Sequence, residues 1–253
     1  MDQTVYVHID TTSNVVVTRG INAKDFHLGV VHPPKNLLLL NPATEYGDYE
    51  THTGLKIIRG AGAVDRYARL VTKGRMNEEN KWIDFTDVSM LKELSPLEIS
   101  ELLYFGHMRN HLHSPFFYKL QNNFVYFDLP HDVARVYYRY LDEFYHILAG
   151  RIKQLAIARM NEKRSFFKRA TTLDNLPVDL LKNLREPMKE GMIFCFHQLT
   201  QDSKVLCIPL FIAEEELAAL PTIASDMTIG RLCYHFDTHT WSLDLEEENL
   251  LFI

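Results

Sequence analysis

The sequence predicts a protein of the α+β class, with an antiparallel, strand-rich N-terminal part, central helices that include one long helix, and C-terminal mixed α/β hairpins. Short β-branched runs separated by turn residues dominate residues 1–92. Apolar residues recur every three or four positions in residues 93–190, and alternating runs return in residues 191–253. Because no internal repeat or Gly/Ser-rich linker divides the sequence, we expect a single compact domain over residues 1–253.

The N-terminal part is predicted to be an antiparallel sheet with long loops. Its strand-like runs are rich in β-branched and aromatic residues, and turn residues separate them. A His-Pro-Pro-Lys stretch between the second and third runs cannot be a central strand, because Pro has no N–H to donate. The predicted strands are Val5–Ile9, Val15–Thr18, Leu55–Ile58, Arg66–Thr72 and Trp82–Phe85.

The central part is predicted to be helical. Ser95 and Glu98 form the pattern of a capping box, with Pro in the first turn, so a helix should begin here and end near Ser114. After a strand at Phe124–Phe127, apolar spacing predicts the long helix. It should run from about Asp132 to about Arg164, with Gly150 as its expected break, and a third helix should follow from Pro177 to Pro187.

The C-terminal part is predicted to contain two hairpins around a short helix. Pro209 should make its strand an edge strand or a bulged one, because it cannot donate a ladder hydrogen bond. The first hairpin pairs Met192–Gln198 with Val205–Ile212, the helix is Ala213–Leu220, and the second hairpin pairs Leu232–Phe236 with Thr240–Leu245.

Composition predicts a soluble, cytoplasmic protein. Residues are 46% hydrophobic and 24% charged, with a net charge of −6, as in ordinary globular proteins. No apolar stretch approaches the roughly 20 residues that a membrane-spanning helix needs, and the N-terminus lacks the features of a secretory signal. Cys195, Cys207 and Cys233 are odd in number and form no C-x-x-C pair. This pattern argues against a disulfide framework and against a cysteine-rich zinc site.

Two histidines on the first central helix are candidate metal ligands. His107 and His111 are four residues apart, so they share a helix face and could hold one divalent metal ion. A third ligand would have to come from elsewhere, and the H-E-x-x-H pattern of metalloproteases is absent. The alternative is a polar helix end, where protonated histidines suit the helix dipole.

Three further patterns suggest chemistry less strongly. His235, Asp237 and His239 would share a face of one strand, but Asp-Thr within them is typical of a turn. The glycine-rich stretch at residues 60–62 lacks the third glycine of a dinucleotide fingerprint, so we interpret it as a turn or bulge. Asp84 and Asp87 form a close carboxylate pair, whose use as acid and base would depend on the fold.

The most unusual feature is a cation-rich stretch at the end of the predicted long helix. Residues 151–169 carry seven Lys or Arg side chains and one acid, Glu162, a local net charge of +6. Phe166 and Phe167 stand among these charges, as stacking residues do in some single-strand binders. The candidate anion-binding residues are Arg151, Arg159, Lys163, Arg164, Lys168 and Arg169. The alternative is a solvated helix end whose cations complement the dipole.

Two functional hypotheses therefore remain open. The first is a non-catalytic binding or regulatory protein whose cationic stretch meets an anionic partner, nucleic acid among them. The second is a hydrolase that depends on a divalent metal held by His107 and His111. The last four residues, Leu250–Ile253, are apolar, so we expect them to dock on their own subunit or on a second copy in a homo-oligomer.

Overall fold

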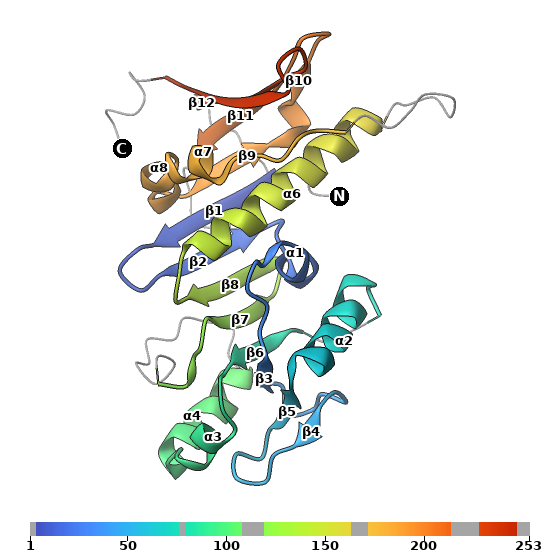
Figure 1. Ribbon diagram of the computed structural model, residues 1–253. Helices are drawn as coiled ribbons and strands as arrows, with labels where there is room; N and C mark the ends of the chain where they lie inside the picture. Colours follow the sequence, from blue (N-terminus) through green and yellow to red (C-terminus); the bar gives the residue numbers. More distant parts are fainter. Residues whose placement is uncertain (1–3, 76–78, 108–118, 163–171, 214–227, 247–253) are drawn as a thin grey trace. The chain divides into compact units, whose positions relative to one another are not determined.

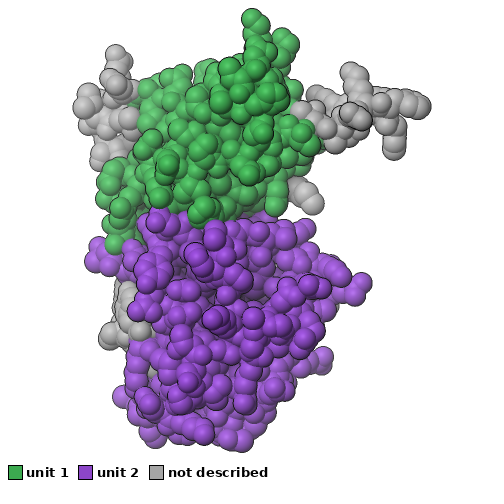
Figure 2. Space-filling view, viewed as in Figure 1, with its two compact units in different colours: residues 1–11, 17–20, 145–253 green, residues 12–16, 21–144 purple. Residues whose placement is uncertain are grey.

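The computed structural model describes residues 4–75, 79–107, 119–162, 172–213 and 228–246. Its fold is of the predicted α+β class, and the strand pairs that follow are all antiparallel (Figure 1). The chain forms two compact units (Figure 2). Unit 1 comprises residues 1–11, 17–20 and 145–253, and unit 2 comprises residues 12–16 and 21–144. The single-domain expectation stays a prediction, because compactness does not decide whether the units fold separately.

Unit 1 contains an antiparallel sheet in the order β13-β12-β11-β9-β1, with β10 beside β11. Its core includes Tyr6, Ile193, Cys195 and Phe211. Strand β2 is divided between the units, and helix α6 begins at Asp142, three residues before the last segment of unit 1 starts at Tyr145. The elements are β1 Thr4–Asp10, β2 Val15–Arg19, α6 Asp142–Asn161, α7 Val178–Lys182, α8 Arg185–Lys189, β9 Met192–Cys195, the 3-10 helix η1 Phe196–Gln198, β10 Thr200–Gln201, β11 Val205–Ile212, β12 Thr228–His235 and β13 Thr240–Leu245.

Unit 2 contains a second run of antiparallel strands, in the order β8-β7-β6-β3-β5-β4. Its core is aromatic: Phe26 meets Trp82, Phe124 and Tyr126 edge-on, and Trp82 stacks on Tyr126. The elements are α1 Ala23–Gly29, β3 Asn36–Leu39, β4 Asp48–Tyr49, β5 Lys56–Arg59, α2 Ala61–Thr72, β6 Lys81–Asp84, α3 Ser89–Lys92, α4 Pro96–His107, β7 Phe124–Leu129 and β8 Val133–Tyr138.

Several predicted elements are confirmed. Ser95 and Glu98 form the expected capping box at the start of α4, because the Ser95 N–H donates to Glu98 Oε2 (2.7 Å) and the Glu98 N–H donates to Ser95 Oγ (3.3 Å). The predicted C-terminal hairpins are present, since β9 pairs with β11 and β12 pairs with β13. The first strand ends earlier than predicted, at Cys195, because Phe196–Gln198 form the 3-10 helix η1. Strand β11 lies inside the sheet and carries an irregularity between Leu210 and Phe211, so of the two roles proposed for Pro209 the bulged strand is the one observed.

Two strand and helix predictions were wrong. The predicted strand Arg66–Thr72 is the second half of helix α2, whose buried residues Val64, Tyr67 and Val71 follow a helical spacing. The predicted helix starting near Asp132 begins instead as strand β8, and the long helix starts only at Asp142. The reason lies in the turn before β8, where His131 and Asp132 both have positive φ (66° and 59°) and so reverse the chain into a hairpin.

Two helix predictions also need correction in detail. Helix α6 continues without a break through Gly150 to Asn161. The predicted helix from Pro177 to Pro187 is two short helices, α7 and α8, which meet at Asn183 and Leu184. The predicted helix Ala213–Leu220 lies, apart from its first residue, outside the described residues.

Candidate functional site

Helix α6 carries the first part of the cation-rich stretch. Asp142 and Glu143 occupy its first turn and Arg159 its last turn, so its charges complement the helix dipole at both ends. Because the helix is continuous, the stretch begins on its second half and passes beyond its carboxyl end. Lys163, Arg164, Lys168 and Arg169 lie outside the described residues.

The two described candidate cations both make contacts within unit 1. Arg151 is partly buried, and its Nε donates to the backbone oxygen of Gly20 at 2.8 Å. This bond attaches the middle of α6 to the residue that follows β2. Arg159 forms an ion pair with Glu162, three residues further along the chain. Arg151 therefore holds the helix in place, and Arg159 shares its charge with the one acid of the stretch.

Beyond the residues that are not described, the chain is anchored again at Asp174. The Tyr234 hydroxyl donates to Asp174 Oδ2 at 2.5 Å, and His239 Nδ1 lies 3.1 Å from the same oxygen. Trp241 Nε1 donates to the Asp174 backbone oxygen at 3.1 Å. These bonds tie residue 174 to the β12–β13 hairpin. A further bond, from Lys153 Nζ to Asn175 Oδ1 at 2.7 Å, ties the next residue to α6.

The electrostatics of this anchor follow from its hydrogen bonds. The bond from the Tyr234 hydroxyl, reinforced by His239, lowers the pKa of the Asp174 carboxyl, so this side chain is a carboxylate at neutral pH. Burial, together with that carboxylate, raises the pKa of Tyr234. Sequence reasoning missed the anchor, because Asp174 and Tyr234 are 60 residues apart and no local pattern marks either of them.

The histidines of the second hairpin do not converge as a shared strand face would require. His235 is the last residue of β12, and its Nε2 lies 2.8 Å from Ser242 Oγ. His239 lies in the turn, with a φ of 57°, and its imidazole contacts Asp174. Asp237 belongs to the turn itself, which is the alternative that its neighbouring Thr indicated.

The predicted metal site lies mostly outside the described residues. His107 is the last residue of α4, and His111 falls in the part that is not described. Within the described ranges, no group of three or more His, Cys, Asp or Glu side chains is placed to hold a metal ion. The pairing of His107 with His111 stays a prediction.

The glycine-rich stretch and the carboxylate pair have structural roles. Gly60, with a φ of 83°, ends β5 and begins α2, and its N–H donates to Asn36 Oδ1 at 3.0 Å. Ala61 and Gly62 already belong to α2, so the interpretation of the whole stretch as a turn or bulge before a strand was wrong, and only Gly60 connects β5 to the helix. Asp84 is fully buried, whereas Asp87 is exposed and accepts from the Ser89 N–H at the start of α3 (2.9 Å). The two carboxyls thus serve separate local structures.

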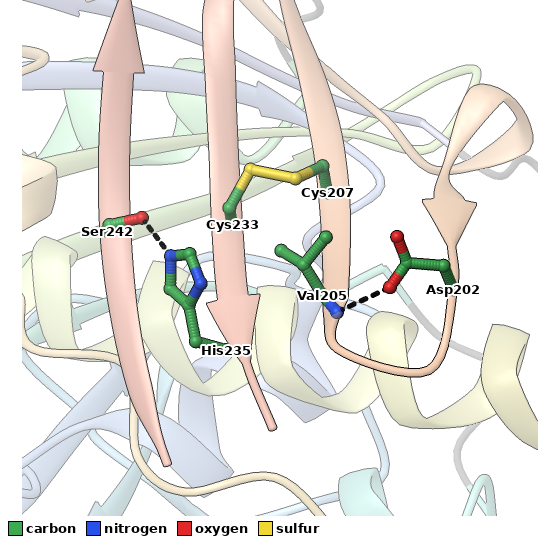
Figure 3. Close-up of a disulfide and its surroundings, with 6 residues drawn as sticks. All are labelled: Asp202, Val205, Cys207, Cys233, His235 and Ser242. Atoms are coloured by element: carbon green, nitrogen blue, oxygen red, sulfur yellow. Dashed lines mark hydrogen bonds between the residues drawn. A yellow bond between two sulfur atoms is a disulfide. The ribbon is translucent and has the colours of Figure 1, made fainter. Parts of the chain in front are cut away.

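One cysteine prediction was wrong. Cys207 and Cys233 form a disulfide between β11 and β12 (Figure 3). Cys195 is a buried free thiol. The odd count concealed this, because a disulfide needs only one pair of residues in register, whatever their spacing along the sequence.

Among the helices that the structure describes, none is both long enough and apolar enough to span a membrane. No known family model, curated protein or solved structure matches the chain. The candidate site is therefore argued from its sequence and from the described residues that flank it. It is the cation-rich stretch that leaves α6, fixed by Arg151 on one side and by the Asp174 anchor on the other.

Proposed function

We propose that this protein is a non-catalytic binding protein that engages an anionic partner, nucleic acid first, through the cation-rich stretch at the end of α6. One observation carries the proposal. Helix α6 runs unbroken to Asn161, and the chain is fastened again at Asp174, so the residues between are held at both ends by unit 1. A held segment loses less conformational entropy on binding than a free tail would.

The charge of the segment supports the same proposal. Its single acid, Glu162, pairs with Arg159. We propose that Lys163, Arg164, Lys168 and Arg169 are the cations that contact phosphates. Lys and Arg neutralise phosphates in a manner that is independent of sequence and sensitive to salt. Phe166 and Phe167 would stack on unpaired bases, which favours a single strand over a duplex.

Cytoplasmic location belongs to this proposal, since nucleic acid and other polyanions are abundant there. The disulfide bears on it directly, because the cytoplasm keeps most thiols reduced. In a cytoplasmic protein, the Cys207–Cys233 disulfide would form and be reduced reversibly. The metal-dependent hydrolase remains the second hypothesis, and no described contact favours it.

The test is a salt titration of oligonucleotide binding. Fluorescence anisotropy of a labelled single strand, and of the matching duplex, is measured with the full chain at several salt concentrations. The variant reverses Lys163, Arg164, Lys168 and Arg169 to Glu. The matched control reverses four exposed cations of unit 2 by the same amount of charge; these are Lys24, Arg66, Lys73 and Lys92.

The proposal predicts a loss of affinity in the first variant only. Each phosphate contact that is removed should flatten the slope of log K against log salt by about 0.7 for a single strand, so four contacts should flatten it by about 3. The control should lose only the smaller, long-range part of the attraction. Equal losses in both variants, or no binding of either oligonucleotide by the wild type at low salt, would contradict the proposal.

A further inference from the structure

The disulfide occupies a directly opposed position on two neighbouring strands. Cys207 of β11 and Cys233 of β12 are register partners, with Cα atoms 4.1 Å apart (Figure 3). Directly opposed residues of an antiparallel pair project their side chains to the same face of the sheet. The two sulfur atoms are therefore brought together by the strand register, and they stay neighbours when the bond between them is broken.

The two cysteines share one face of the sheet but differ in their exposure. On β11 the flanking Leu206 and Ile208 are fully buried, whereas Cys207 between them is partly exposed. Cys233 is 7% exposed. Of the two, Cys207 is thus the more accessible to a reagent in solution.

A cation, Arg231, and a histidine, His235, flank the less exposed cysteine. Arg231 and His235 lie two residues before and after Cys233, so they project to the same face of β12. Arg231 is exposed, and His235 is held in place by Ser242 of β13 (Figure 3). A nearby cation such as Arg231 stabilises a thiolate, and a stabilised thiolate is the better leaving group in disulfide exchange.

The third cysteine, Cys195, is a free thiol that is buried. Cys195, at the end of β9, is buried in the core of unit 1, and burial raises the pKa of its thiol. Its sulfur lies 3.3 Å from His197 Nδ1, within the same short segment. A buried thiol of this kind is inert and serves as an internal reference for the other two.

We propose that Cys207–Cys233 is a reversible thiol–disulfide exchange site that accepts electrons from a dithiol reductant. A thiolate of the reductant attacks Cys207 Sγ, the bond between the two protein sulfurs breaks, and Cys233 Sγ leaves with the electron pair. The second sulfur of the reductant then attacks its partner in the mixed disulfide and releases Cys207. The two protons of the dithiol end on Cys207 and Cys233, and the reductant becomes a cyclic disulfide.

Reduction of the Cys207–Cys233 bond would change the surroundings of the β12–β13 hairpin. Tyr234 follows Cys233 in β12 and contacts Asp174 and the Trp241 ring, whose centroid lies 5.1 Å from that of Tyr234. Trp241 lies in unit 1 and the other tryptophan, Trp82, in unit 2. A change in fluorescence that is lost in Trp241→Phe would therefore report on the strands that the disulfide joins.

The test measures exchange in the folded full chain. Cells are lysed in an alkylating agent, and mass spectrometry then identifies which cysteines are linked. Separately, the purified protein is treated with dithiothreitol without denaturant, then with oxidised glutathione, and thiols are counted by alkylation at each stage. Cys195→Ser removes the inert thiol and should keep the full cycle, whereas Cys207→Ser and Cys233→Ser should each abolish it.

The expected result is that both thiols appear under native conditions and disappear again on oxidation, with the protein folded throughout by circular dichroism. Arg231→Glu should slow reduction several-fold, while Arg185→Glu, an equal charge change on exposed helix α8 of the same unit, should leave the rate unchanged. Two outcomes would overturn the proposal. In one, the pair is never linked in the protein; in the other, it is linked but reduced only after unfolding.

Discussion

The buried carboxyl of Asp84 should make the stability of unit 2 depend on pH. Asp84 ends β6, is fully buried, and accepts hydrogen bonds from the Asn123 N–H (3.0 Å) and Asn122 Nδ2 (3.2 Å). Burial outweighs these bonds and raises the pKa from 3.8 to about 6. The native protein therefore holds this proton at pH values where the unfolded chain has released it.

The sign and size of the effect follow from linkage. Because the folded pKa is the higher one, stability falls as pH rises from 3.8 to about 6, and the loss is complete above that window. A shift of this size corresponds to about 3 kcal/mol. Between pH 7 and pH 4.5 the wild type should regain about 2 kcal/mol relative to Asp84→Asn, in which nothing titrates at this position.

Urea unfolding at several pH values measures this difference. Trp82 lies two residues before Asp84, so fluorescence in a Trp241→Phe background follows unit 2. Asp87→Asn is the matched control: hydrogen bonds from Ser89 lower the pKa of Asp87, so the stability it contributes is lost as pH falls, the opposite trend. If the wild type and Asp84→Asn differ by the same amount at pH 4.5 and pH 7, the buried carboxyl does not retain its proton and the reasoning is refuted.

Three further predictions concern α6, the metal hypothesis and the C-terminus. Gly150→Ala should stabilise the protein by about 0.5–1 kcal/mol in urea unfolding, because an added Cβ meets no atom within 4 Å; a loss of stability would contradict this. If His107 and His111 bind a divalent ion, that ion at 100 times its Kd should stabilise the fold by about 2.7 kcal/mol, seen as a higher Tm. The shift should vanish in the double Ala variant, and its persistence there would exclude the pair. Deleting Leu250–Ile253 should lower Tm if the tail packs on its own subunit, or dissociate an oligomer in light scattering if it is exchanged; a variant unchanged in both would show that the tail docks nowhere.

The elements that sequence reasoning found correctly are those with a local stop and start signal. The capping box of Ser95 and Glu98 predicted the beginning of α4, and the polar turn after His235 predicted the β12–β13 hairpin. A similar signal was overlooked at α1, where Asn22 and Asp25 form a reciprocal capping box. Its residues were readable in the sequence, so this omission was avoidable.

The wrong elements are short apolar runs whose periodicity fits both helix and strand. Tyr67 and Val71 are four residues apart in a helix, and Val133 and Tyr137 are four residues apart in a strand. Periodicity over so few residues does not separate the two cases. The turn at His131 decides the second one. Its signal is present in the sequence, because Pro130 and Asp132 are turn formers and Asp tolerates the left-handed conformation.

For the candidate site, the sequence predicts the charge but not the contacts that hold the stretch in place. The cation-rich stretch is local in sequence, so its charge can be counted from the residues alone. What holds it could not be predicted: Arg151 reaches Gly20 across 131 positions, and Asp174 reaches Tyr234 across 60. Such contacts depend on which strands are neighbours in the sheet, and strand order is not a local property of the sequence.

The cysteine count favoured a reducing cytoplasm, and the Cys207–Cys233 disulfide weakens that argument. It joins residues 26 positions apart, and closing a loop of that length in the unfolded chain corresponds to about 3.5 kcal/mol of stabilisation in the chain-entropy model. Unit 1 in a reducing compartment would have to stay folded without that contribution. The backbone hydrogen bonds of its sheet do not depend on the disulfide: β11 is also paired with β9, and β12 is also paired with β13. Because β12 is paired with a strand on each side, loss of the bond should loosen the β12–β13 hairpin before it unfolds the unit.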